Sequence, residues 1–363
     1  MTTENMSLDK LVLDVLNDVK LEKFTVLIAG KTGVGKSTII NEVFKGNIAN
    51  TGSGRPVTDK INEYKKDGIP ISIIDTIGFE LADYTKIIDE LSEYIDSRLS
   101  SDNADDHIHV AWICINTSGD RIEEAEIDLI KKIRSYNIPV IVVLTKTLNT
   151  KSPFIEEARK ILPEANAVIP IRALPEDIDG YELKPMGIDK LIEETYKLLP
   201  DAKKRAYTNA LSNKHKKALE LRKKQASIEV NIASGLAGAA GATPIPFSQA
   251  FVLVPIQIGM LARISQVFGM DVNATMLSTL VSSFIGAGSA TIIGRFIVSG
   301  LIKLIPGAGS VVGGAIAATT AISLTKLLGN TYIDVLYDYS KRNPGSEFDV
   351  QAIFKELKQR LKF

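Results

Sequence analysis

An eight-residue run near the start of the chain constrains its fold more than any other feature. The run Gly30-Lys-Thr-Gly-Val-Gly-Lys-Ser37 matches the pattern G-x-x-x-x-G-K-S/T at every fixed position. It follows an apolar, β-branched stretch, Phe24 to Ala29, that predicts a buried strand, and a helix is predicted from Ser37 to about Lys45. Glycines in such a turn let backbone N–H groups point at an anion lying at the positive end of the helix. The pattern therefore predicts a phosphate-binding loop made of Gly30, Lys31, Thr32, Gly33, Val34, Gly35, Lys36, Ser37 and Thr38.

Side chains in this loop and in a second motif have predicted roles in phosphate chemistry. Lys36 can neutralise β- and γ-phosphates, and the Ser37 hydroxyl can bind Mg²⁺. The second motif, Asp75-Thr-Ile-Gly78, ends a strand that is expected to lie beside the phosphate loop. Asp75 is predicted to hold the Mg²⁺ shell, and the Gly78 N–H to contact the γ-phosphate.

The first 200 residues alternate between strand and helix patterns. Strands separated by helices of about 10–15 residues imply right-handed crossovers and a mostly parallel sheet. The Asp67-Gly68 dipeptide between two strand-like runs adds one antiparallel edge hairpin. The prediction is a three-layer α/β domain over residues 1–200, with strands at 24–29, 61–66, 69–76, 108–116, 139–145 and 167–171, and helices at 7–20, 37–45, 84–99, 123–135, 154–162 and 188–198.

These motifs resemble those of P-loop GTPases of the translation-factor-related class, nearest the Era-like and immunity-related branches, over about residues 1–200. The resemblance implies GTP and GDP as ligands, Mg²⁺ as the metal, and GTP hydrolysis. It also implies a switch threonine that binds Mg²⁺, assigned to Thr58 in the Gly52–Thr58 loop, with Thr51 as an alternative. The catalytic candidates are Lys36, Thr58 and Gly78, and the metal candidates are Ser37, Thr58 and Asp75.

Base recognition departs from the family pattern. Relatives end a strand with N/T-K-x-D, whose carboxylate accepts hydrogen bonds from guanine, whereas here Thr145 and Lys146 are followed by Thr147 and Leu148. Lys146 can still pack over a purine ring, and the Ala173 N–H can contact guanine O6. GTP is the favoured ligand, and an adenine-nucleotide ATPase remains an alternative.

The water-positioning glutamine of many relatives is also absent. Phe79 stands in its place, and Gly33 stands where potassium-dependent members have an asparagine. Glu80 and Arg55 are candidate helpers. Intrinsic GTP hydrolysis is therefore expected to be slow, with self-association of the GTPase domain as a homodimer supplying part of the catalysis.

Composition separates the two halves of the chain. The 363 residues carry 43 basic and 43 acidic side chains, but residues 201–363 hold 19 of the basic and only 9 of the acidic ones.

One cysteine, Cys114, excludes a disulfide framework and fits a reducing compartment. Because no apolar signal segment is visible before Lys20, a cytoplasmic location is expected. His107 and His109 are read as structural, since a third metal ligand is lacking nearby.

Residues 201–363 are predicted to form an apolar, all-helical domain led by a basic helix, Lys203 to Lys224. The stretch from Val230 to Ala262 holds no charged residue, and 276–294 and 304–325 are further apolar candidates. Contact with a membrane through residues 230–330, at the cytoplasmic face, is one interpretation, and a buried helical bundle is the other. A final amphipathic helix is predicted within Glu347–Phe363.

The break at Thr243-Pro-Ile-Pro-Phe247, with the helix that follows it, resembles an uncharacterised helical domain often fused behind bacterial GTPases and usually described as membrane-associated. The sequence is thus interpreted as a bacterial GTP-binding switch whose nucleotide state controls the helical domain. The alternative is a nucleotide-gated binding module for a ribosome, RNA or protein partner, and salt-sensitive binding of RNA to the basic helix would favour it.

Overall fold

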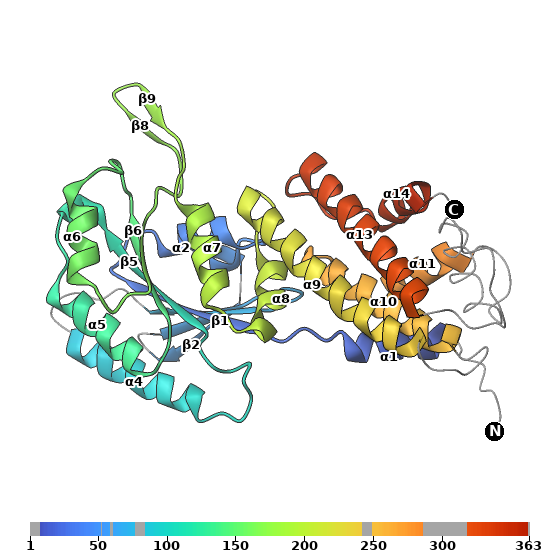
Figure 1. The fold of residues 1–363 in the computed structure, drawn as a ribbon. Helices are drawn as coiled ribbons and strands as arrows, with labels where there is room; N and C mark the ends of the chain where they lie inside the picture. Colours follow the sequence, from blue (N-terminus) through green and yellow to red (C-terminus); the bar gives the residue numbers. More distant parts are fainter. Residues whose placement is uncertain are drawn as a thin grey trace. The chain divides into compact units, whose positions relative to one another are not determined.

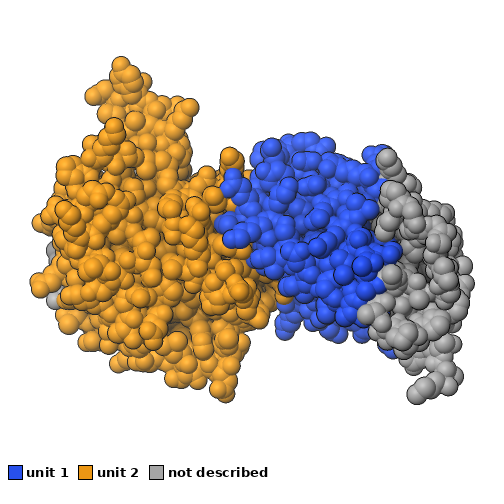
Figure 2. All heavy atoms as spheres, viewed as in Figure 1, with its two compact units in different colours: residues 1–20, 219–363 blue, residues 21–218 orange. Residues whose placement is uncertain are grey.

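The computed structural model describes residues 8–51, 53–58, 61–76, 84–241, 249–285 and 318–361. The chain forms two compact units, coloured separately in Figure 2. The larger unit is Leu21–Ala218, and the smaller unit joins Met1–Lys20 to Leu219–Phe363.

The larger unit is built on a mostly parallel sheet with the strand order β2-β3-β4-β1-β5-β6-β7 (Figure 1). Strands β4, β1, β5, β6 and β7 run parallel, whereas β3 pairs antiparallel with both β2 and β4. This confirms the predicted parallel sheet and the hairpin at Asp67-Gly68. The strands are β1 Phe24–Gly30, β2 Ser53–Thr58, β3 Ile61–Lys65, β4 Ile71–Thr76, β5 Val110–Asn116, β6 Val140–Thr145 and β7 Ala167–Pro170.

Helices cover both faces of this sheet, because the central strands are apolar on both sides. All seven residues of β1 are buried. One face packs against apolar side chains of α4, α5 and α6. The other face carries an aromatic cluster in which Phe44 stacks on Trp112 at 5.6 Å and Tyr207 meets Phe24 at 5.2 Å. The helices of this unit are α2 Lys36–Val43, α3 Ile48–Thr51, α4 Tyr84–Leu99, α5 Glu124–Ser135, α6 Pro153–Ile161, α7 Ile188–Leu198 and α8 Asp201–Ala210.

A short second sheet follows β7. Strands β8 Glu176–Ile178 and β9 Tyr181–Leu183 pair antiparallel and form the arm labelled in Figure 1. Asp179 and Gly180 connect them with φ of 50° and 84°. Positive φ at both central residues is typical of a two-residue hairpin turn, and an Asp-Gly pair favours it.

The smaller unit is helical in its described residues and has its own apolar core. Side chains from all six helices described for this unit are buried together there. The predicted C-terminal amphipathic helix is confirmed, since Ile353, Phe354 and Leu357 of α14 are buried in this core. The helices are α1 Leu8–Asp18, most of α9 Lys216–Gly241, α10 Gln249–Val267, α11 Ala274–Ile285, α13 Ala318–Arg342 and α14 Val350–Leu361.

The division into units differs from a boundary at residue 200 in two places. Helix α8 contacts β1 and β4 and so stays with the sheet. Helix α1 instead buries Leu11, Val12 and Val15 in the core of the smaller unit. Its amphipathic pattern specified an apolar face but did not specify which core would cover that face.

The prediction of one basic helix from Lys203 to Lys224 is wrong. The helix breaks after Ala210, where Leu211 forms a β-bridge with Phe44 and the Ser212 N–H donates to Val43 O at 2.8 Å. Lys203 is buried and pairs with Glu22 at 2.9 Å and Asp105 at 2.6 Å. Charge and helical periodicity predicted one continuous helix here. The backbone contacts of Leu211 and Ser212 with the end of α2 interrupt it.

Several predictions for the apolar half fall on residues outside the description. The break at 243–247 belongs to that group, as do residues 286–294 and 304–317 of the two further apolar candidates. None of the described helices is both long enough and apolar enough to cross a bilayer.

Candidate functional site

The predicted phosphate loop joins the end of β1 to the start of α2. Gly30 lies so close to β5 that a Cβ there would be 2.3 Å from the Cys114 carbonyl oxygen. Gly35 precedes α2 with φ of 104°, in the left-handed region that disfavours other residues. Only glycine meets both requirements, so the backbone explains these two fixed positions of the motif.

Lys36 is folded over the loop that precedes it. Its Nζ donates to Gly30 O at 2.9 Å and to Lys31 O at 3.4 Å, and the side chain is 9% exposed. The same Nζ lies 3.9 Å from Asp75 Oδ1. Because β1 and β4 are parallel neighbours, with Ile28 opposite Asp75, the two motifs meet at the same edge of the sheet.

Asp75 carries a mostly buried carboxylate, 16% exposed, that forms an ion pair with Lys36. Its Oδ1 is buried and has no hydrogen-bond partner. Burial raises the pKa of Asp75 to about 6, although nearby Lys36 lowers it. Mg²⁺ prefers oxygen ligands, and the Asp75 carboxylate and the exposed Ser37 hydroxyl at the first turn of α2 are oxygen donors from the two motifs. The residues present therefore fit a bound Mg²⁺ ion.

Two further candidates, Thr58 for metal binding and catalysis and Gly78 for catalysis, do not lie in the part of the site described so far. Residues 53–58, expected as a switch loop, lie in β2, where Thr58 stands opposite Ile61. Pairing with β3 gives this glycine-containing segment the extended conformation, so its composition did not reveal the strand. Gly78, Phe79 and Glu80 lie outside the described residues. The roles of Thr58 and Gly78 stay predictions.

A pocket of about 410 Å³ joins the phosphate loop to the two strand ends predicted to hold the base. Its lining includes Val34, Gly35 and Thr38 from the loop and helix α2. Thr145, Lys146 and Ala173 line it from the ends of β6 and β7. Folding thus brings candidates from sequence positions more than a hundred residues apart into one cavity.

Thr145 and Lys146 are held by the neighbouring strand end. The Thr145 hydroxyl donates to Ile115 O at 3.3 Å, and the Thr117 hydroxyl donates to Thr145 O at 3.1 Å. Lys146 has φ of 55°, and its side chain is exposed. A bound base could therefore be covered by the lysine stem while the backbone of the loop stays fixed.

Arg172 is a positioning residue that the sequence did not reveal. Its guanidinium is 8% exposed and donates to the carbonyl oxygens of Thr147 and Leu148, each at 3.3 Å, and of Lys184 at 2.9 Å. Three carbonyls on two loops are thus tied by one side chain. Leu148, at the place of the missing carboxylate, is 49% exposed and does not line the pocket.

Lys31 ties the phosphate loop to α5. It forms an ion pair with Glu123, and this contact lowers the pKa of that carboxyl. Glu126 in turn accepts from the Glu123 N–H at 2.9 Å, which caps the helix. The Glu-x-x-Glu spacing was visible in the sequence, but its link to Lys31 depends on the fold.

Two further titratable side chains, His109 and Cys114, are buried in or beside the sheet. The His109 Nδ1 accepts from the Thr25 N–H at 3.1 Å, and burial lowers the pKa of His109 to about 4. Burial raises the pKa of the Cys114 thiol to about 12. No cluster of three or more metal-binding side chains occurs in the described ranges. The hydrogen bond to the Thr25 N–H gives His109 a structural contact between neighbouring strand ends.

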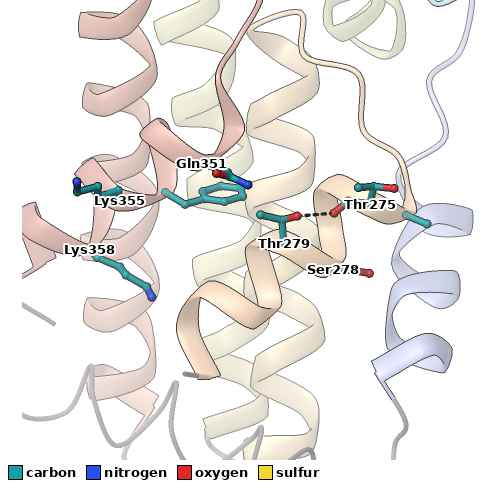
Figure 3. A pocket seen from close by; sticks show the side chains of 8 residues that line it. Thr275, Ser278, Thr279, Gln351, Lys355 and Lys358 are labelled. Carbon is teal, nitrogen blue, oxygen red and sulfur yellow. Dashed lines mark hydrogen bonds between the residues drawn. The ribbon is translucent and has the colours of Figure 1, made fainter. Parts of the chain in front are cut away.

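The smaller unit has a cleft of its own, shown in Figure 3. It measures about 780 Å³ and lies between α11 and α14. The Thr279 hydroxyl in its wall donates to Thr275 O at 2.8 Å. None of the predicted site residues lines it; its lining is Ala274, Thr275, Ser278, Thr279, Gln351, Phe354, Lys355 and Lys358.

Comparison with known proteins matches residues 25–146 to the family described as "50S ribosome-binding GTPase". The chain is 30% identical over 125 residues to a probable GTP-binding protein EngB of Kosmotoga olearia, covering 34% of this chain and 64% of that protein. It is 27% identical over 182 residues to GTPase Era of Clostridium botulinum, covering 48% and 55% of the two chains. The chain therefore spans less than two thirds of either relative.

Among solved structures, one similar chain is Era of Aquifex aeolicus bound to GDP·AlF₄⁻. It is 22% identical with a TM-score of 0.33, and the match covers 50% of this chain and 58% of that one. A further relative by sequence, Septin-14 of Mus musculus, is 26% identical over 166 residues, covering 40% and 38% of the two chains.

Proposed function

Because residues 25–146 form a P-loop GTPase domain of the Era/EngB type, we propose that this chain is a guanine-nucleotide switch. It binds GTP and GDP with Mg²⁺ and hydrolyses GTP slowly. Its nucleotide state changes what the helical unit can bind. The observation that carries the proposal is the meeting of Lys36 and Asp75 beside the loop that ends β1.

The residues of the loop have distinct tasks in this mechanism. Lys36 exchanges its contacts with Gly30 O and Lys31 O for oxygens of the β- and γ-phosphates, where its charge offsets the charge that develops during transfer. Asp75 and Ser37 would hold Mg²⁺, which supplies further charge neutralisation when bound. The N-terminus of α2 adds N–H donors to the same anion.

Hydrolysis is slow in this proposal because the chain has Phe79 where many relatives orient water with glutamine. A second GTPase domain, brought in by self-association, supplies the remaining groups. The lone, buried Cys114 supports a reducing location such as the cytoplasm.

The helical unit carries a surface that supports membrane contact as the output of the switch. Ile228, Ile232 and Leu236 are 40%, 51% and 51% exposed and follow one another at four-residue spacing on α9. Residues four apart lie on one face of a helix, so these side chains form an exposed apolar stripe. Nucleotide-dependent co-sedimentation with anionic vesicles tests this output, and salt-sensitive RNA binding without vesicle binding would replace it with the RNA alternative.

Nucleotide affinity tests the proposal directly. The full chain is titrated with fluorescent GDP, GTP, ADP and ATP in Mg²⁺, and guanine nucleotides should bind at least tenfold more tightly, about 1.4 kcal/mol. Lys36→Ala should abolish binding while the fold is retained, and Lys86→Ala, on the exposed side of α4, should bind like the wild type. Micromolar binding by the Lys36 variant would show that the phosphate loop is not the site, and a preference for adenine would end the guanine assignment.

A further inference from the structure

The base pocket has an acidic wall that comes from the β8–β9 hairpin. Glu176 and Asp177 both line the pocket, together with Ala173 and the loop residue Gly35. The position that normally supplies a carboxylate holds Leu148, which lies outside the lining. The pocket therefore lacks a carboxylate at position 148 but has two from the hairpin, at Glu176 and Asp177.

The two carboxylates are not equally available. Asp177 Oδ1 accepts from the Gly180 N–H at 3.0 Å, which holds it in the hairpin turn. Glu176 is exposed, and its carboxylate has no hydrogen-bond or ion-pair partner in the described ranges. Across the hairpin, Glu176 stands opposite Leu183, which brings no competing charge. Glu176 is therefore the group free to receive a ligand.

The base of the hairpin is anchored beside the pocket. The backbones of Arg172 and Met186 exchange two hydrogen bonds, at 3.1 and 2.8 Å. The Arg172 side chain adds its bond to Lys184 O at 2.9 Å. Glu176 follows Ala173 by three residues, so the N–H predicted to contact guanine O6 and the free carboxylate come from one anchored segment.

We propose that Glu176 is the specificity-determining residue that recognises guanine in place of the missing aspartate. An ionised carboxylate accepts hydrogen bonds and donates none. Guanine presents donors at N1 and at the exocyclic N2, whereas adenine presents an acceptor at N1. Glu176 therefore favours guanine and disfavours adenine, and its side chain closes over the base edge from the hairpin. This inference rests on the proposed function of the same site.

The test measures dissociation constants of the full chain for GDP, ADP and the inosine and xanthosine diphosphates. Glu176→Gln should weaken GDP binding at least tenfold, about 1.4 kcal/mol, and leave ADP binding within about twofold. Because the amide can donate to the C2 carbonyl of xanthine, binding of xanthosine diphosphate should become tighter. A variant that merely lost structure would bind all four nucleotides more weakly.

A matched control lies on the partner strand. Glu182 on β9 is exposed, stands opposite Asp177 and does not line the pocket. Glu182→Gln removes the same charge from the same hairpin and should leave all four affinities unchanged. If both variants lost the same GDP affinity, the cause would be the removal of a negative charge from the hairpin and not a contact with the base. That result would overturn the proposal.

The remaining outcomes separate this inference from the proposed function. If wild type prefers GDP and Glu176→Gln keeps the same GDP-to-ADP ratio, Glu176 is not the acceptor, while the guanine-nucleotide switch stands. If wild type binds none of the four nucleotides, the proposed function fails before the question of Glu176 arises.

Discussion

Replacing Asp75 with asparagine should stabilise the nucleotide-free protein at neutral pH. The Asp75 carboxylate is mostly buried, its Oδ1 accepts no hydrogen bond, and burial raises its pKa from 3.8 to about 6. At about 1.4 kcal/mol per pH unit, that gap corresponds to about 3 kcal/mol of unfavourable free energy once the group is ionised. An amide of nearly the same shape does not carry that charge.

The sign of the pH dependence follows from the raised pKa. Between about pH 4 and 6 the folded protein holds a proton at Asp75 that the unfolded chain has released. The stabilising contribution of protonated Asp75 is therefore fully present below about pH 4. It is lost as the pH rises through about 6, where the folded protein releases the proton. Asp75→Asn and wild type should be similar near pH 4, and the variant should be more stable by up to about 3 kcal/mol near pH 7.5.

Urea unfolding in EDTA, without nucleotide, measures the difference. Trp112 is the chain's one tryptophan and is fully buried in the sheet, so its fluorescence reports unfolding of the larger unit. Asp67→Asn, in the exposed turn of the β3–β4 hairpin, is the control and should change stability by no more than about 0.5 kcal/mol.

Ligand should reverse the order of the two proteins. Excess Mg²⁺ and GDP should stabilise wild type more than Asp75→Asn, because stabilisation by a ligand follows its affinity for the folded state. The reasoning is refuted if the metal-free variant is no more stable than wild type at pH 7.5, or if the difference between them does not grow with pH.

Two further predictions concern the strands beneath the site. Gly30→Ala places a Cβ 2.3 Å from Cys114 O and should lower the free energy of unfolding by roughly 3 kcal/mol or more. Gly33→Ala, with no atom within 4 Å, should cost only about 1 kcal/mol of backbone strain, and equal losses in urea unfolding would contradict the contact argument. His109 has a pKa lowered to about 4 by burial, so its stabilising contribution is present above pH 6.5 and is lost as pH falls toward 4, by up to about 3 kcal/mol. His109→Gln should remove that part of the acid sensitivity in the same assay, and an unchanged pH profile would count against it.

The pocket for the base depends on contacts that no local pattern specifies. The Asp179-Gly180 turn joins two strands that the sequence analysis did not predict, and the cavity that they border depends on the tertiary structure. No local pattern indicated a role for Arg172, and only the fold shows its guanidinium donating to the carbonyl oxygens of Thr147, Leu148 and Lys184. Only the folded chain shows that Glu176 lines the same pocket as the phosphate loop and the end of β6.

The sequence by itself determined the phosphate loop and the mostly parallel sheet around it. Gly30 and Gly35 are required by backbone conformation and close approach, and the β-branched run of β1 is buried on both faces; such requirements act over a few residues and leave a local signature. The tertiary structure alone decided which core covers α1, where the basic segment breaks at Leu211, and that Lys203 is buried against Glu22 and Asp105. An apolar face or a charge is specified by the sequence, but its partner depends on side chains brought together across a hundred residues or more, and only packing selects among them.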